Sequence, residues 1–137
     1  MKNCKTNKIT MRKIKFRAKR SDDGKWVFGD LTHEYRITRD KDIPCIRVAR
    51  YNIDESSIGQ FTGITDKNGK DIYEGDIMND PTSMCVGVVE WNSILCQFQL
   101  SWQNMHTAAD LFFMVKCGSF VIGNIHDNPE MRKGGAK

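Results

Sequence analysis

The chain has 137 residues, of which 39% are apolar and 28% charged, an ordinary composition for a soluble globular protein. This length fits one domain or two very small ones, and it can bury a hydrophobic core without disulfide or metal staples. No apolar run approaches the roughly 20 residues that a membrane helix needs, and no apolar segment of a secretory signal follows the basic start, so we expect a cytoplasmic protein with no membrane partner.

The net charge of +4 hides a strong asymmetry along the chain. Residues 1–20 contain nine of the 21 lysines and arginines and no acid, so the remainder carries 12 cations and 17 acids. Residues 59–131 are the most acidic part, with three lysines against nine acids. The sequence therefore predicts a basic N-terminal arm on an acidic body, and such an asymmetry bears on the partners of a protein.

The cysteines and histidines follow no metal-binding pattern. No Cys-x-x-Cys occurs, and no histidine lies three to five residues from another. We therefore expect no metal and no cofactor. The cysteines are odd in number, and we expect reduced thiols, as is usual in the cytoplasm, at Cys4, Cys45, Cys85, Cys96 and Cys117.

The N-terminal region is predicted to be a disordered basic leader, residues 1–11, followed by a strand. The leader has almost no apolar content and no periodicity. In KIKFRAK, residues 13–19, apolar and basic residues alternate, which is typical of a strand with one face in solvent. The basic residues are interpreted first as this solvated face. As an alternative they are candidate nucleic-acid contacts, namely Lys13, Lys15, Arg17, Lys19 and Arg20.

Tight turns and short strands continue through the middle of the chain. Asp23-Gly24 favours a type I′ hairpin turn, because both central residues of that turn need positive φ. Strands are predicted around residues 35–38 and 45–51, with a turn at 40–42. The polar run DESS, residues 54–57, is predicted to be a break and the best boundary between two modules.

The segment GQFTGITDKNGKDIYEGDIM, residues 59–78, raises the question of a metal or catalytic loop. Asn68-Gly69 is the strongest short hairpin signal that a sequence can carry, and Gly75-Asp76 predicts a second turn. These four residues are interpreted as a structural turn motif, because turn chemistry already explains Asn, Asp and Gly at these places.

Two functional interpretations of the same segment have less support. If Gly69 were the sixth position of an EF-hand loop, the first and twelfth would be Ile64 and Gly75, and neither supplies a carboxylate. Glu74 and Asp76 could form a catalytic carboxylate pair, but beside Gly75 they are expected to shape the turn.

A faint internal repeat links residues 15–31 with residues 60–77 at an offset of 45 residues. Phe16 then matches Phe61, and Gly24 matches Gly69. Two similar β-modules, one kind of hairpin used twice, and chance similarity between short hairpins would each explain the match.

The C-terminal part combines strands with short helical segments. Strands are predicted in CVGVVEWN (85–92), LCQFQLSW (95–102) and SFVIGNI (119–125). Between the second and third of these, residues 107–116 are predicted to form a helix capped by Thr107 and docked on the sheet by Leu111, Phe112, Met114 and Val115. Asn128 and Pro129 predict a final helical turn, and the tail, residues 132–137, is expected to be flexible.

This pattern predicts a mainly β fold of small, partly open barrels. The motifs IKFRAK, GKWVFGDL, GQFTGITDKNGKDIYEGDI, VVEWN and VIGNIHDNPE, spread from Arg12 to Met131, resemble the YopX family of phage and prophage proteins. The resemblance implies an SH3-like barrel or roll in the C-terminal part (59–131), a hairpin-rich N-terminal part (12–58) and one or two short helices. It also implies homo-oligomers, and it carries over no catalytic residue.

Three functional hypotheses follow. The leading one is a non-enzymatic phage or prophage accessory protein, a β-barrel interaction module that associates with itself or with a phage or host protein. The alternative is nucleic-acid binding by the basic arm, with bases stacked on Trp91, Phe98 or Trp102, although an acidic body disfavours it. An enzyme is not expected, because nothing in the sequence places a cysteine beside His33, His106 or His126.

Overall fold

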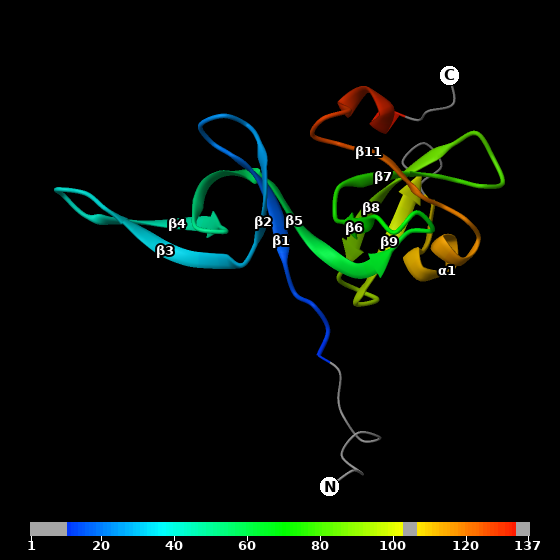
Figure 1. Ribbon diagram of the computed structural model, residues 1–137, viewed down its shortest axis with the longest axis horizontal. Coiled ribbons are helices and arrows are strands. Elements are labelled where there is room, and N and C mark those ends of the chain that lie inside the picture. The colour runs from blue at the N-terminus through cyan, green and yellow to red at the C-terminus, as the bar shows by residue number, and fades with distance from the viewer. Residues whose placement is uncertain (1–10, 103–106, 134–137) are drawn as a thin grey trace, which may run out of the picture.

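The computed structural model describes residues 11–102 and 107–133, and these residues are mostly β-strand (Figure 1). The strands and helices are β1 (Phe16–Arg20), β2 (Trp26–Gly29), β3 (Leu31–Ile37), β4 (Asp42–Val48), β5 (Tyr51–Thr65), β6 (Asp71–Tyr73), β7 (Asp76–Asn79), β8 (Val86–Asn92), β9 (Gln97–Trp102), β10 (Thr107–Asp110), α1 (Leu111–Lys116), β11 (Val121–Asn124) and the 3-10 helix η3 (Pro129–Lys133).

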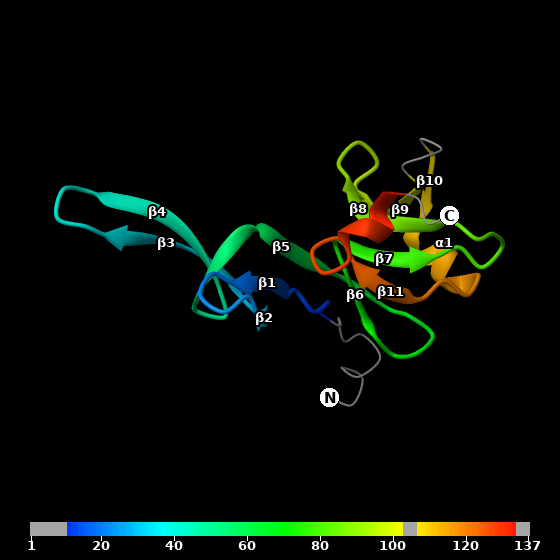
Figure 2. The ribbon, with the colours of Figure 1, turned by 90° about the horizontal axis from the view of Figure 1, so that it is seen from above.

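The strands form two antiparallel sheets. One has the order β2-β1-β5-β4-β3, with β6 paired to the far end of β5, and the other has the order β10-β9-β8-β7-β11. Figures 1 and 2 show the second sheet curled beside α1, whereas β3 and β4 extend away from it. The mainly β prediction is therefore confirmed, and the SH3-like barrel stays a prediction.

Strand β5 connects the two halves of the molecule, which are the N-terminal half around β1–β4 and the C-terminal half around the sheet of β7–β11. It pairs with β4 at its start, with β1 in its middle and with β6 at its end. The predicted break at residues 54–57 is wrong, because these residues lie inside β5. They form an irregular bulge opposite β1, where Ser57 Oγ accepts a hydrogen bond from the Lys19 amide at 2.7 Å. The predicted boundary between residues 58 and 59 also falls within this strand.

The two sheets have cores of unequal size. The C-terminal core joins Ile72, Met78, Val89, Leu100, Trp102, Leu111 and Met114. Among the described residues, the N-terminal core has three buried residues, Ala18, Val48 and Ile53, and five partly buried apolar residues pack against them. This smaller core provides less hydrophobic stabilisation, so the N-terminal sheet depends more on its contacts with the rest of the protein.

The predicted hairpin turns are present, but their geometry differs from the prediction. The loop after β1 closes with the Arg20 amide on the Lys25 carbonyl oxygen, and φ is positive at Gly24 (73°) but not at Asp23. A type I′ turn has only two central residues, so the predicted type was wrong. The loop after β5 also has positive φ at its glycine, Gly69 (80°). The two stretches of the internal repeat therefore form hairpins with a left-handed glycine at matching positions.

The turn between β4 and β5 was not predicted. Ala49 and Arg50 both have positive φ, 53° and 69°, although neither is Gly, Asn or Asp. The Ala49 amide donates to the Asp30 carbonyl oxygen, which helps to hold this strained turn. As a result β4 ends at Val48, and the strand predicted over 45–51 is in fact the end of one strand and the start of another.

Helix α1 begins later than predicted and is capped by a different residue, whereas the final helical turn begins where it was predicted. Thr107 does not cap α1, because residues 107–110 form β10 on β9, and Asp110 caps the helix by accepting from the Phe113 amide. Leu111 is buried as predicted, but Phe112 is 56% exposed and does not dock on the sheet. The final turn, η3, begins at Pro129. None of the helices in the described ranges is long and apolar enough to cross a membrane.

Candidate functional site

The basic face of β1 lies against the acidic half of the protein and not in solvent. Lys15 Nζ is 2.8 Å from Asp71 Oδ2, and Lys19 Nζ is 2.5 Å from Asp127 Oδ1. Between them, Arg17 Nη2 lies 2.8 Å from Asp76 Oδ1. Alternate residues of an extended chain point to one face, so Lys15, just before β1, and Arg17 and Lys19 within it meet three acids that come from distant parts of the chain.

We call these three ion pairs the joint, and Arg17 lies at their centre. Its side chain is 7% exposed and that of Asp76 is 1% exposed, so the predicted solvated position of Arg17 is wrong. The guanidinium also lies over the rings of Trp26 (4.6 Å) and Tyr73 (5.0 Å) and donates to the Glu74 carbonyl oxygen at 3.3 Å. These contacts fix β1 and β2 against the turn before β7.

The carboxylate of Asp76 has a structural role in the turn between β6 and β7. Its Oδ2 accepts from the Tyr73 amide at 2.8 Å, while its other oxygen meets Arg17. Burial raises the pKa of Asp76, and the nearby Arg17 cation opposes that rise. Glu74 uses its carboxylate elsewhere, accepting from the Gln60 amide at 2.8 Å. The two carboxylates considered as a catalytic pair thus serve different partners.

The hairpin turn at Asn68-Gly69 is organised by the neighbouring Asp66. Oδ1 of Asp66 accepts from the Asn68 and Lys70 amides, and Oδ2 accepts from the Val121 amide at 3.0 Å. Burial alone would raise the pKa of Asp66, but these three amides outweigh it and hold the pKa below its ordinary value. The glycine-rich segment is therefore tied to β11, and the turn residues contribute no free carboxylate there.

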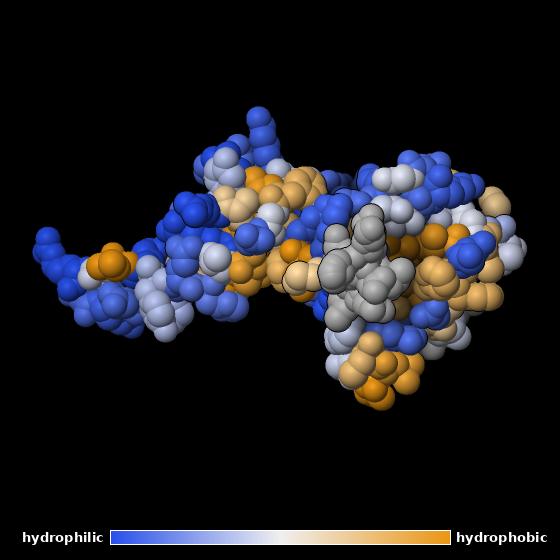
Figure 3. Space-filling view, turned by 60° about the horizontal axis from the view of Figure 1, so that its bottom comes forward, coloured by the Kyte–Doolittle hydropathy of each residue, from blue (hydrophilic) through white to orange (hydrophobic). Residues whose placement is uncertain are grey.

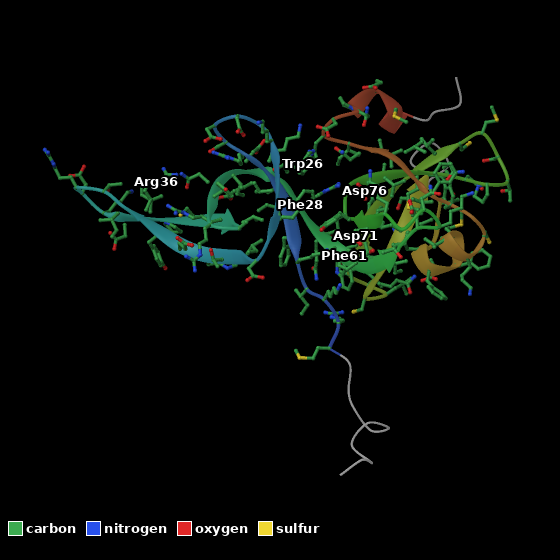
Figure 4. All side chains as sticks on the ribbon, in the orientation of Figure 1. Trp26, Phe28, Arg36, Phe61, Asp71 and Asp76 are labelled. Atoms are coloured by element: carbon green, nitrogen blue, oxygen red, sulfur yellow. The ribbon has the colours of Figure 1, made fainter. Side chains whose placement is uncertain are left out.

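A cavity of about 440 Å³ opens beside the joint. Figure 4 shows Trp26 and Phe28 on β2, with Asp71 and Asp76 on the other half. The lining residues are Lys15, Arg17, Trp26, Phe28, Lys70, Asp71, Tyr73, Asn124 and Asp127. Of its charged groups, Lys15 and Asp71 pair with each other, whereas Arg17 and Asp127 pair with Asp76 and Lys19 outside the lining. The Trp26 indole N–H donates to Asp127 Oδ2 at 2.9 Å. The cavity is thus bounded by the contacts that join the two halves.

The remaining nucleic-acid candidates are divided between surface and core. Lys13 is exposed, whereas Arg20 bonds Asp22 with both its Nε and Nη2. Among the aromatic candidates, Trp102 is buried in the C-terminal core, and Trp91 packs edge-on against Phe98 at 5.0 Å. Arg12 of the basic arm lines a pocket together with Trp91 and Phe98, so the structure brings one cation of the arm to two of the aromatic candidates, with Glu74 beside them.

The thiols and imidazoles also lie apart where they are described. Cys45 pairs with Glu34 across β3 and β4, while His33 pairs with Ile46, so the two side chains point to opposite faces of the hairpin. His126 packs edge-on against Trp26, and burial together with the cations Arg17 and Lys19 lowers its pKa. His106 and Cys4 lie outside the described residues. Within the described residues no cluster of three or more His, Cys, Asp or Glu could hold a metal ion.

The second distinctive feature is the hairpin of β3 and β4, residues 31–48, which we call the projecting hairpin. Its base reaches the N-terminal core through Leu31 and Val48, and Figures 1 and 2 show that its outer part extends away from the rest of the protein. Only two residue pairs, Arg47 with Asn52 and Val48 with Tyr51, join β4 to β5, so the outer part of the hairpin has only two strands. Tyr35 and Ile37 are 66% and 83% exposed. On the face seen in Figure 3 the hairpin is otherwise mostly hydrophilic.

Comparisons with known proteins agree with the fold. A model of the YopX protein family matches residues 15–132. A search of curated proteins finds no match. Among solved structures, the crystal structure of protein EF1440 from Enterococcus faecalis is similar, with a TM-score of 0.55 and 22% sequence identity over 89% of this chain and 99% of that chain. At this identity the likeness concerns the fold alone.

Proposed function

Because the chain belongs to the YopX protein family, we propose that it is a non-enzymatic accessory protein of a phage or prophage. It acts in the cytoplasm of the bacterial host as a β-rich interaction module, and it associates with itself. The observation that carries this proposal is the projecting hairpin, whose outer part pairs with no third strand and contains no buried residue within the described part of the chain.

An isolated two-stranded hairpin is marginally stable in water, because it needs a third strand or a packed face for support. The outer part of the projecting hairpin instead presents Tyr35 and Ile37 to solvent. Its outer strand, β3, is the last strand of its sheet, so one row of its backbone N–H and C=O groups has no partner strand among the described residues. Binding to a protein would supply the missing strand and cover these side chains.

Nucleic-acid binding has less support. The cations of β1 that would contact phosphates are engaged with acids of the same chain, at Lys15, Arg17 and Lys19. Residues 59–131, which surround them, carry six more acids than lysines. A polyanion would have to displace these acids before it reached the cations, at a cost in electrostatic free energy.

Sedimentation velocity of the full chain over a wide range of concentrations tests the proposal. We expect a species larger than the monomer of 15.7 kDa. His33 lies opposite Ile46, so residues 34–45 can be replaced by Asn-Gly to give a shortened hairpin with a two-residue turn. The shortened variant is expected to be monomeric, and its tryptophan fluorescence spectrum is expected to be unchanged because Trp26, Trp91 and Trp102 lie outside the deleted segment. A full chain that remains monomeric at every concentration would rule out self-association.

A further inference from the structure

We propose that the free edge of β3 pairs antiparallel with β3 of a second copy, in the register that places Tyr35 opposite Tyr35 of that copy. This inference rests on the proposed self-association and adds the surface and the register. Pairing of the two strands would build a four-stranded sheet from two marginal hairpins, in the order β4-β3-β3-β4. Three or more strands with a packed face are enough for stable β-structure.

The two-fold symmetry of a dimer restricts how two identical strands can pair. A residue that lies a given number of positions before the central pair then faces the residue that lies the same number of positions after it in the other copy. With Tyr35 at the centre, Glu34 lies opposite Arg36 of the second copy, and Arg36 lies opposite Glu34. Directly opposite residues in an antiparallel pair have adjacent side chains on the same face, so each copy offers one acid–base pair and a shared tyrosine pair.

The neighbouring symmetric registers are less favourable. A centre on Glu34 would place two carboxylates directly opposite each other, and a centre on Arg36 would do the same with two guanidinium groups. Like charges in directly opposite positions destabilise a strand pair. Of these three registers, the one centred on Tyr35 is the one that places opposite charges face to face, so the charges of β3 favour this alignment.

Arg36 is available for this contact. Its neighbour across the hairpin is Ile43, and it takes part in no salt bridge among the described residues. Figure 4 shows it on the projecting hairpin, away from the labelled residues of the joint. Glu34 Oε1 has Arg47 of its own chain at 3.4 Å, and Oε2 accepts from the Thr32 hydroxyl at 2.6 Å. A carboxylate has about four acceptor sites, and this side chain is about one-third exposed, so it keeps acceptor sites for a second cation.

The test exchanges charges between two variants and follows assembly by sedimentation velocity. In Arg36→Glu alone, the introduced glutamate of each copy faces Glu34 of the other copy, and in Glu34→Arg alone, the introduced arginine of each copy faces Arg36 of the other copy. Each variant is expected to bind itself at least about tenfold more weakly than the wild type. A mixture of the two variants restores an acid opposite a base at every position, so it is expected to assemble as heterodimers.

Arg39→Glu is the matched control, because it makes the same charge change at the turn between the strands, outside β3. It is expected to leave assembly unchanged. If the wild type assembles and Arg36→Glu assembles equally well, the β3 pairing is wrong while self-association stands. If both variants are folded by circular dichroism but their mixture remains monomeric, the Tyr35-centred register is wrong. A wild type that never assembles would overturn this inference together with the proposed self-association.

Discussion

Replacement of Arg17 by methionine tests how the two halves of the protein are held together. Methionine keeps most of the apolar stem of arginine but removes the cation, so the carboxylate of Asp76 stays buried with only the Tyr73 amide as a partner. Breaking a buried ion pair by removal of one member costs about 3–5 kcal/mol. Since domains of this size are stable by about 5–15 kcal/mol, we expect Arg17→Met to lose a large part of the free energy of unfolding.

The assay is urea denaturation followed by tryptophan fluorescence and by circular dichroism. Arg20→Met is the matched control, because its pair with Asp22 has side chains 29% and 64% exposed, and exposed pairs contribute about 1 kcal/mol or less. The double variant Arg17→Met/Asp76→Asn removes the unpaired charge and is expected to recover part of the loss. If Arg17→Met costs no more than Arg20→Met, the joint does not hold the two halves as argued.

Three further predictions concern the backbone and the pH dependence. Arg50→Gly relieves the positive φ of an exposed residue in the β4–β5 turn, so the urea midpoint should rise by an amount equivalent to about 0.5–1 kcal/mol; no change would mean that the turn is unstrained. Gly59→Ala places a Cβ 2.5 Å from the Glu74 carbonyl oxygen, so the thermal midpoint should fall by the equivalent of about 1–3 kcal/mol, and an unchanged midpoint would contradict the close approach. The pKa of His126 is lowered in the folded protein, so the unfolded chain binds this proton first as the pH falls below the ordinary value of 6.5, and the free energy of unfolding decreases there. His126→Gln should flatten this part of the plot of stability against pH. A plot that the substitution leaves unchanged would assign the pH dependence to other groups.

Local signals in the sequence predicted local structure well. The Asn68-Gly69 pair predicted a hairpin because the required positive φ is a property of the glycine itself. The Ala49-Arg50 turn gave no such signal, since its conformation is imposed by the strands on either side and by the Asp30 carbonyl oxygen. The DESS run misled for a related reason, because its polar side chains bond within a bulge of β5 and do not end the strand.

The pattern of apolar and charged residues could not predict contacts between residues that lie far apart in the sequence. Alternation in KIKFRAK identified a strand, but it could not show what covers the basic face, because the acids Asp71, Asp76 and Asp127 lie far along the chain. The sequence did show a basic stretch followed by an acidic domain. The ion pairs of the joint, which form within one chain, explain part of this asymmetry. The sequence did not predict that the hairpin of β3 and β4 projects from the protein, because the residues of the two strands do not indicate how the hairpin is placed relative to the two cores.

The joint also has a consequence for the order in which the protein matures on the ribosome. Lys15 and Asp71 are 56 residues apart, and at about 5–20 residues per second the acid emerges roughly 3–11 s after its partner. The contact of Trp26 with Asp127 spans 101 residues and is made only when almost the whole chain has been synthesised. Before Asp71 and Asp76 emerge, Lys15 and Arg17 have no acidic partner, so a nascent chain that stalls before Asp76 exposes the Arg17 guanidinium.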